Sequence, residues 1–165
     1  MDTEKQYFIY YGQYEGISLT SKIIRFFTWS NISHTAAFFP PNEQGEYGDI
    51  IEAWREGVVR RHWTVGHKKG TKITIFKVPC TKFQQDKFYA LMQEKLGKKY
   101  DFFGVIGFPF RKIWESPNRW FCSEAVYHSA LLAGIMLFRN IQAYQVFPGL
   151  LSVTPYAEEV GVLTI

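Results

Sequence analysis

The stretch WFCSEA at residues 120–125 decides the fold that the rest of the chain must complete. Just before it, residues 116–119 read SPNR and predict a loop, because proline bars helix continuation and serine and asparagine favour turns. From Cys122 onward, small and apolar residues recur three and four positions apart as far as Gly134. This spacing predicts a buried helix that the glycine ends. Cys122 is therefore expected in the first turn of that helix.

A cysteine at that position is suited to act as a nucleophile. Unpaired backbone N–H groups and the positive end of the helix dipole stabilise a thiolate, which is the reactive form. The alternative interpretation is that Cys122 is a small buried hydrophobic side chain, a common fate of a free cysteine. Catalysis also needs a base, a group that orients the base, and an oxyanion site.

Length and composition indicate one globular domain spanning residues 1–165. Hydrophobic residues make up 47% of the chain and aromatic residues 18%, which is typical of a folded protein with a sizeable core. Two cysteines far apart in the chain, Cys80 and Cys122, do not make a secreted disulfide framework. No signal peptide and no apolar run of membrane-spanning length is evident, so we expect a cytoplasmic protein without a transmembrane segment.

The charge pattern argues against a nucleic-acid partner. The net charge is +4, yet the basic residues are spread out apart from pairs at 60–61, 68–69 and 98–99. Such a pattern is typical of a solvated surface rather than of a nucleic-acid groove. The net charge does favour weak peripheral contact with anionic membranes. The oligomeric state stays open.

The remaining pattern predicts an α+β domain in which an antiparallel sheet packs against the Cys122 helix. Residues 34–39 and 49–54 are expected to pair as a hairpin across a polar turn. A first helix is expected to begin at Ser18 or Thr20 and to place Ile23, Ile24 and Phe27 on one face. Further predictions are strands over 6–11 (ended by Gly12) and 71–78 (ended by Pro79), a bent extension over 58–61, a helix over 82–96, an aromatic, glycine-rich segment over 100–108, short segments near 143–146 and 150–153, and a short final helix or tail.

The hairpin carries the candidate partners of Cys122. His34 opens the first strand and Glu52 lies on the second, and cross-strand pairing can bring two such residues close on one face. A carboxylate between Ile51 and Ala53 is costly unless it has a partner, and an imidazole N–H is a suitable one. Taken singly, His34 is equally well explained as a satisfied strand-end histidine, and Glu52 as a solvent-facing residue of an alternating strand.

Taken together, the order of these motifs resembles a known family. HTAAFF at 34–39, IIEA at 50–53, GKKYDFFG at 97–104 and FCSE at 121–124 are similar to motifs of the permuted NlpC-type, papain-like cysteine hydrolases. More narrowly they resemble the YiiX/YebB-like branch, which is related to the lecithin:retinol acyltransferase-like proteins. In the permuted branch the histidine strand precedes the cysteine helix, as it does here. The resemblance runs from about residue 7 to residue 154.

The resemblance implies a circularly permuted papain-like fold and a role for each matching residue. Cys122 would be the nucleophile, His34 the general base and then acid, and Glu52 the group that orients His34. Tyr100 would line the substrate site, although Phe103 replaces one glycine of the family pattern. The opening YGQY at 11–14 also departs from the usual Gly-Asp-Leu-like start. No metal and no cofactor is implied.

The other titratable residues receive smaller roles. His128 lies six positions after Cys122 and nearly opposite to it on the helix, which does not suit a base. His62 and His67 show no spacing typical of a zinc site. Glu124 is expected to stabilise the helix N-terminus structurally.

Three functions follow from the sequence. The first is a cysteine hydrolase that cleaves an amide bond in a peptide, a cell-wall peptide or an N-acyl compound through a thioester. The second is a lipid acyl hydrolase or acyltransferase that uses the same chemistry, with the aromatic residues after Tyr100 lining an acyl channel. The third is a binding module that keeps the fold without catalysis.

Overall fold

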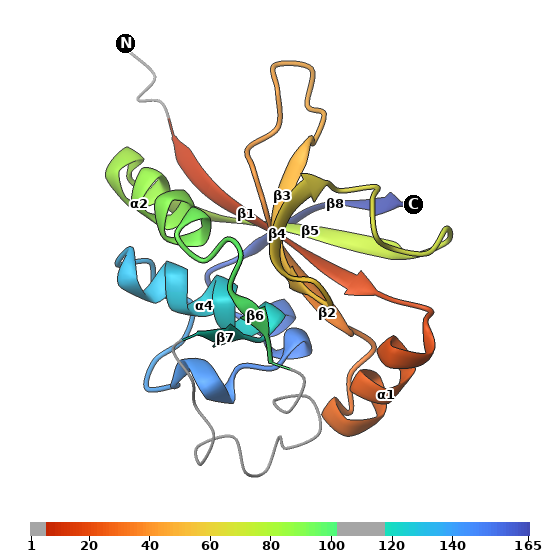
Figure 1. Cartoon of the computed structure of the whole chain (residues 1–165). Coiled ribbons are helices and arrows are strands. Elements are labelled where there is room, and N and C mark those ends of the chain that lie inside the picture. The colour runs from red at the N-terminus through yellow and green to blue at the C-terminus, as the bar shows by residue number, and fades with distance from the viewer. Residues whose placement is uncertain (1–5, 102–117) are drawn as a thin grey trace.

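The computed structural model describes residues 6–101 and 118–165, which build a six-stranded sheet with helices against one of its faces (Figure 1). The strand order is β4-β3-β2-β1-β5-β8, and each neighbouring pair is antiparallel. The predicted fold class, an α+β domain with an antiparallel sheet on the cysteine helix, is confirmed. The six strands are β1 (Tyr7–Glu15), β2 (His34–Phe38), β3 (Asp49–Trp54), β4 (Gly57–His62), β5 (Lys72–Cys80) and β8 (Glu158–Thr164).

Helix α1 begins at one of the two capping residues that the sequence predicts, and α2 begins with a capping box. Ser18 accepts a hydrogen bond from the backbone N–H of Ser21 at the start of α1 (Leu19–Thr28). At the start of α2 (Lys82–Gln93), Thr81 and Gln84 cap one another's backbone N–H groups. Helix α4 (Cys122–Leu132) is followed by Gly134 at φ 77°, as expected of a terminating glycine. Two 3₁₀ turns follow, η2 (Ala143–Gln145) and η3 (Pro148–Val153).

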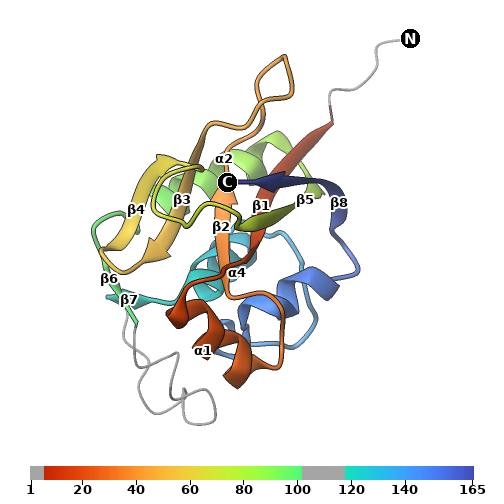
Figure 2. The ribbon, with the colours of Figure 1, turned by 90° about the vertical axis from the view of Figure 1, so that its right-hand side faces the viewer.

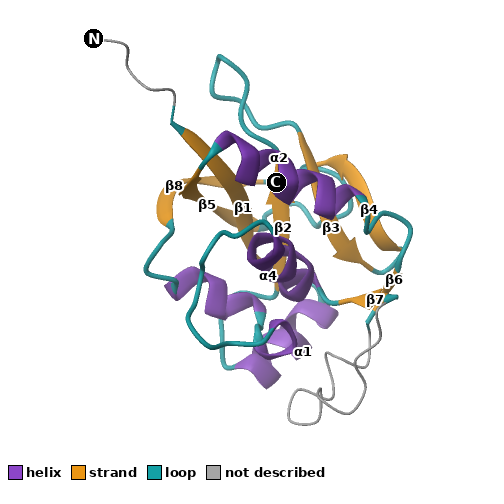
Figure 3. Ribbon diagram, turned by 90° about the vertical axis from the view of Figure 1, so that its left-hand side faces the viewer, coloured by secondary structure: helices purple, strands orange, loops and turns teal. Residues whose placement is uncertain are grey.

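The sheet has two faces with separate hydrophobic clusters. Helices α2 and α4 cover one face, which we call the helix-covered face (Figure 3). Its cluster joins strand residues such as Tyr11, Ala37 and Ile51 to residues of α2 and α4, Cys122 among them. The cluster of the opposite face is built from the alternate residues of the same strands, since successive strand residues point to opposite faces. Its buried members are Tyr14, Ala36, Phe38, Ile50, Ile73 and Ile75.

Strand β1 does not stop at Gly12, as the sequence predicted, but runs on to Glu15. Gly12 lies in the middle of the sheet, opposite Ala36 on one side and Ile75 on the other. A Cβ atom there would collide with the ring of Phe38 and lie 2.9 Å from Cγ2 of Ile73. The glycine therefore allows close packing inside the sheet, rather than ending the strand.

Two further predictions about strands are corrected. Strand β5 runs past Pro79 to Cys80, because its pairing with β8 ends at Lys77 and the missing N–H of the proline then faces an unpaired edge. The end of the chain is not a helix or a tail but strand β8, which pairs with β5. The register between them shifts at Ile75 and Phe76, so that Val160 is left out of the pairing as a β-bulge.

Smaller elements position the cysteine helix. Strands β6 (Lys99–Tyr100) and β7 (Arg119–Trp120) pair in parallel, directly before α4. Helix α1 connects β1 to β2 and lies at one end of the sheet (Figure 2). The predicted aromatic segment after Asp101 and the loop before Asn118 lie mostly outside the described residues. Within the described ranges, every helix is too short or too polar to cross a bilayer.

Candidate functional site

The histidine half of the site lies where β1 and β2 meet. His34 is the first residue of β2, and the register places it opposite Tyr14 of β1. The two rings contact edge to face with centroids 5.1 Å apart, and the ring of Trp54 lies 4.7 Å away on the other side. His34 is buried, with 1% of its surface exposed. Pairing with Tyr14 places the imidazole on the face of the sheet opposite to α4.

Glu52 is the centre of a buried polar network. Its Oε2 lies 2.5 Å from Nε2 of His34 and 2.9 Å from Nε2 of His67. Its Oε1 accepts a hydrogen bond of 2.6 Å from Nε of Arg61, which pairs with the carboxylate through the guanidinium. The carboxylate side chain is fully buried. The hairpin thus brings His34 and Glu52 together on one face, as the sequence analysis expected.

Sequence reasoning missed His67. This residue lies in the loop between β4 and β5, and its ring contacts those of Tyr14 and Trp54 with centroids 4.5 and 5.0 Å apart. Its side chain is only 4% exposed. Neither periodicity nor spacing places a loop residue against a strand, so the sequence holds no signal that joins His67 to Glu52.

The protonation state of the network follows from burial and charge. Burial lowers the pKa of His34 more than the neighbouring Glu52 carboxylate raises it. Burial alone would raise the pKa of Glu52, but the imidazoles of His34 and His67 hold it below the usual range. The favoured state is therefore a Glu52 carboxylate, offset by Arg61, that accepts an N–H bond from a neutral His34 imidazole. In this state Nδ1 of His34 carries a lone pair, and it is buried without a hydrogen-bond partner.

The cysteine half is built on α4. Cys122 is the first residue of the helix and is 1% exposed, as predicted for a buried first turn. Glu124 accepts a hydrogen bond of 3.3 Å from the backbone N–H of Phe121, which is the structural role expected of it. The hydroxyl of Ser123 donates to the carbonyl of Val146 at 2.6 Å and fixes the helix to the turn η2. These contacts give the thiol a rigid support.

The two halves lie on opposite faces of the sheet and are not hydrogen-bonded to one another. Cys122 belongs to the cluster of the helix-covered face, together with Ala37, whereas His34 lies three positions earlier on β2 and points to the opposite face. Neither ring nitrogen of His34 bonds the Cys122 thiol: Nε2 pairs with Glu52, and Nδ1 has no partner. The structure therefore brings His34 to Glu52 but leaves Cys122 apart from both.

The remaining predicted residues lie near the cysteine half. Tyr100, in β6, is 9% exposed, and its ring lies 6.0 Å from that of Phe121, the residue before Cys122. His128 packs on Trp120 with ring centroids 4.9 Å apart, and burial lowers its pKa. His128 is not among the hydrogen-bond partners of Glu52, which agrees with the expectation that it is not the base.

A small pocket reaches the histidine half from solvent. It has a volume of about 170 Å³ and is lined by residues of three segments: the start of α1 (Ser18 and Ser21 among them), the end of β3 at Trp54, and the loop that carries His67. Access to the network therefore passes beside the N-terminus of α1.

The same network meets the requirements of a metal centre. His34, Glu52 and His67 each offer one ligand atom, and these atoms lie within 4.8 Å of one another. Two imidazole nitrogens and one carboxylate oxygen form a donor set typical of zinc. The protons now shared between Nε2 and the carboxylate are those that a bound cation would displace. The residues present fit a divalent transition-metal ion.

Comparisons with known proteins define the fold. No family model matches the chain, and no curated protein matches it. Among solved structures, the metalloprotein YiiX from Escherichia coli O157:H7 matches with a TM-score of 0.69 and 22% sequence identity, over 93% of this chain and 95% of that one. The two proteins share a fold over nearly their whole length. This agrees with the expectation, from the motif order, of the fold of the YiiX-like branch.

Proposed function

We propose that a chain with this fold and this histidine network is a cysteine hydrolase, with Cys122 as nucleophile, His34 as base and Glu52 as its orienting group. The observation that carries the proposal is the contact of 2.5 Å between Nε2 of His34 and Oε2 of Glu52, which leaves Nδ1 as a buried nitrogen without a hydrogen-bond partner. With the proton on Nε2, held by the carboxylate, Nδ1 is a proton acceptor. A general base needs such a lone pair, held in a fixed orientation by a third group.

The reaction proceeds through a thioester. Nδ1 of His34 takes the thiol proton as Sγ of Cys122 attacks the carbonyl carbon, and the backbone N–H of Cys122 at the helix N-terminus stabilises the oxyanion. The imidazolium then protonates the leaving group, and water hydrolyses the thioester with the same base. In the structure the thiol and the imidazole lie on opposite faces of the sheet, so the proposal requires a second conformation of the free protein, in which the start of β2 turns His34 toward α4 and Nδ1 reaches the thiol.

The substrate class we favour is an amide: a peptide, a cell-wall peptide or an N-acyl compound. Tyr100, close to Phe121, would contact the acyl part. A lipid ester or thioester would use the same nucleophile.

The test is the rate at which iodoacetamide modifies Cys122, followed by mass spectrometry over a range of pH. At neutral pH we expect the wild type to react about tenfold or more faster than His34→Ala, because Nδ1 takes the thiol proton. Cys80 is an internal reference, since burial raises its pKa. His62→Ala is the control, because the His62 side chain is exposed and its ring hydrogen-bonds to Thr64, two residues further along the chain. Equal rates in wild type and His34→Ala at every pH would favour the binding-module alternative.

We infer a second function for the same network, the binding of a divalent transition metal. It rests on the three ligand atoms within 4.8 Å of one another, and the structurally similar YiiX is described as a metalloprotein. His34, Glu52 and His67 would hold the ion, which as a Lewis acid would polarise a bound carbonyl or water.

Zinc titration against a chromogenic chelator tests this second function and separates it from the first. We expect His67→Ala to weaken zinc binding about tenfold or more, because one of three ligands is lost. His62→Ala, with an exposed imidazole, should bind as the wild type does. A wild-type affinity no greater than that of the His67→Ala variant would rule out the metal site while leaving the hydrolase proposal intact.

A further inference from the structure

Helix α1 buries a face that is turned away from the one its sequence predicts and shares only Ile24 with it. Its buried residues are Ser21, Ile24 and Thr28, two of which are small and polar. Their hydroxyls are satisfied locally: Ser21 Oγ pairs with Ser18 Oγ at 2.8 Å, and Thr28 Oγ1 donates to the carbonyl of Ile24 at 2.8 Å. The predicted apolar face is thus divided, with only Ile24 inside.

The large apolar side chains of α1 point to solvent instead. Leu19 is 74% exposed, Phe26 73% and the flanking Trp29 94%. Ile23 and Phe27, expected in the core, are also more than two-fifths exposed. On a helix, positions 19, 23, 26 and 27 share one side. Together with Trp29, their side chains form a continuous apolar surface, which we call the α1 patch. Monomeric globular proteins seldom expose such a surface unless it is an interaction site.

Trp29 occupies a backbone conformation that its side chain does not favour. It ends α1 with φ 51° and ψ 36°, the left-handed region in which glycine is the usual residue, and its N–H bonds the carbonyl of Arg25. A bulky residue in that region costs free energy, and such strain is most often kept where function requires the side chain. Here the strained residue is also the most exposed large apolar side chain of the described chain.

The charges around the α1 patch point to its partner. Lys22 and Arg25 line the same surface hollow as Phe26 and Trp29, and α1 contains no acidic residue. A short helix with aromatic and leucine side chains on one side and flanking cations is typical of helices that lie in the interface of a bilayer. Two copies of the chain docked through this surface would instead bring like charges together, in a protein of net charge +4.

We propose that α1 docks on anionic lipid membranes, with the α1 patch inserted at the level of the headgroups and Lys22 and Arg25 paired with lipid phosphates or carboxylates. The proposal concerns attachment alone, and it holds whether or not Cys122 is a nucleophile.

Sedimentation of the protein with vesicles tests the proposal. We expect the wild type to bind vesicles made of equal parts phosphatidylserine and phosphatidylcholine, and to bind less tightly at high salt or to phosphatidylcholine alone. The double variant Phe26→Ser, Trp29→Ser should lose about tenfold or more in affinity, because two inserted aromatic side chains are removed. Lys22→Glu, Arg25→Glu should lose binding to the anionic vesicles selectively.

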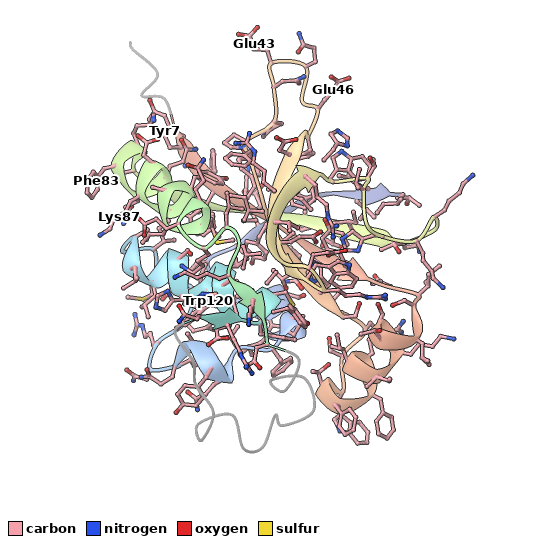
Figure 4. All side chains as sticks on the ribbon, in the orientation of Figure 1. Tyr7, Glu43, Glu46, Phe83, Lys87 and Trp120 are labelled. Atoms are coloured by element: carbon pink, nitrogen blue, oxygen red, sulfur yellow. The ribbon has the colours of Figure 1, made fainter. Side chains whose placement is uncertain are left out.

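The matched control is Phe83→Ser. Phe83 is also 73% exposed, but it lies on α2 at the opposite end of the molecule from α1 (Figure 4). The Phe83→Ser variant should bind vesicles as the wild type does, and circular dichroism should show that every variant is folded. Three results would overturn the proposal: no binding by the wild type, equal loss in Phe83→Ser, or a wild-type dimer in sedimentation velocity that the Phe26 and Trp29 substitutions dissociate.

Discussion

Cys122→Ala is expected to abolish hydrolysis of an activated acyl substrate, with a loss in turnover of about a thousandfold or more. The alanine removes the sulfur atom that the proposal assigns to the thioester, and loss of a nucleophile leaves only the residual effect of binding and oxyanion stabilisation. The fold should persist, because Cys122 is a small member of a large hydrophobic cluster. The measurement is turnover of a p-nitrophenyl ester or anilide, together with the melting temperature of the variant.

The second cysteine supplies the control for this experiment. Cys80 is half-buried at the end of β5, on the edge of the sheet, and is not part of either half of the site. Cys80→Ala should keep full turnover. The double variant Cys80→Ala, Cys122→Ala should have the same turnover as Cys122→Ala alone. Turnover that survives in Cys122→Ala would contradict the proposed nucleophile, and turnover lost equally in both single variants would indicate a general effect on folding.

Glu52→Ala is expected to lower the free energy of unfolding by about 3–5 kcal/mol. The substitution leaves the Arg61 guanidinium, whose side chain is 16% exposed, without its buried counter-charge. It also deprives two buried imidazole N–H groups of their acceptor. Removing one partner of a buried ion pair costs this much because the other charge stays uncompensated. Urea unfolding followed by fluorescence measures the change, which is a large share of the stability of an ordinary domain.

Asp49→Ala is the matched control, since it removes a carboxylate from the same strand. Asp49 pairs with Arg60 at 2.9 Å, but both side chains are nearly half exposed, so the loss should be about 1 kcal/mol or less. The double variant Glu52→Leu, Arg61→Leu should recover part of the stability that Glu52→Ala loses, because no buried charge remains unpaired. A Glu52→Ala loss no larger than that of Asp49→Ala would show that the network is not a stabilising centre.

The sequence could predict those parts of the molecule that depend on local pattern. The hairpin of β2 and β3 follows from two short apolar runs around a polar turn, and it accounts for the contact between His34 and Glu52. The start of α4 at Cys122 follows from the spacing of small residues. Both are decided by neighbours within a few positions, where periodicity and turn chemistry are informative.

The parts that could not be predicted depend on long-range packing. Whether a side chain at the end of a strand faces α4 or the opposite side depends on how the helix docks, so the separation of His34 from Cys122 was not visible in the motifs. His67 reaches Glu52 from a loop. Helix α1 has a strong apolar pattern, yet it buries Ser21 and Thr28 together with Ile24 alone from the predicted face. An amphipathic pattern shows that a helix has an apolar face, but it does not identify what that face packs against.

The β-bulge at Val160 has a consequence for solubility. Strand β8 is an edge strand with Val160 and Val162 exposed, the kind of surface on which a second chain could add by strand pairing and so begin aggregation. The register shift bends the strand at that point and leaves Val160 unpaired, while Glu158 and Glu159 place like charges beside it. The irregular, charged edge gives an incoming strand no flat template, so a chain that exposes these valines can still remain dispersed at high concentration.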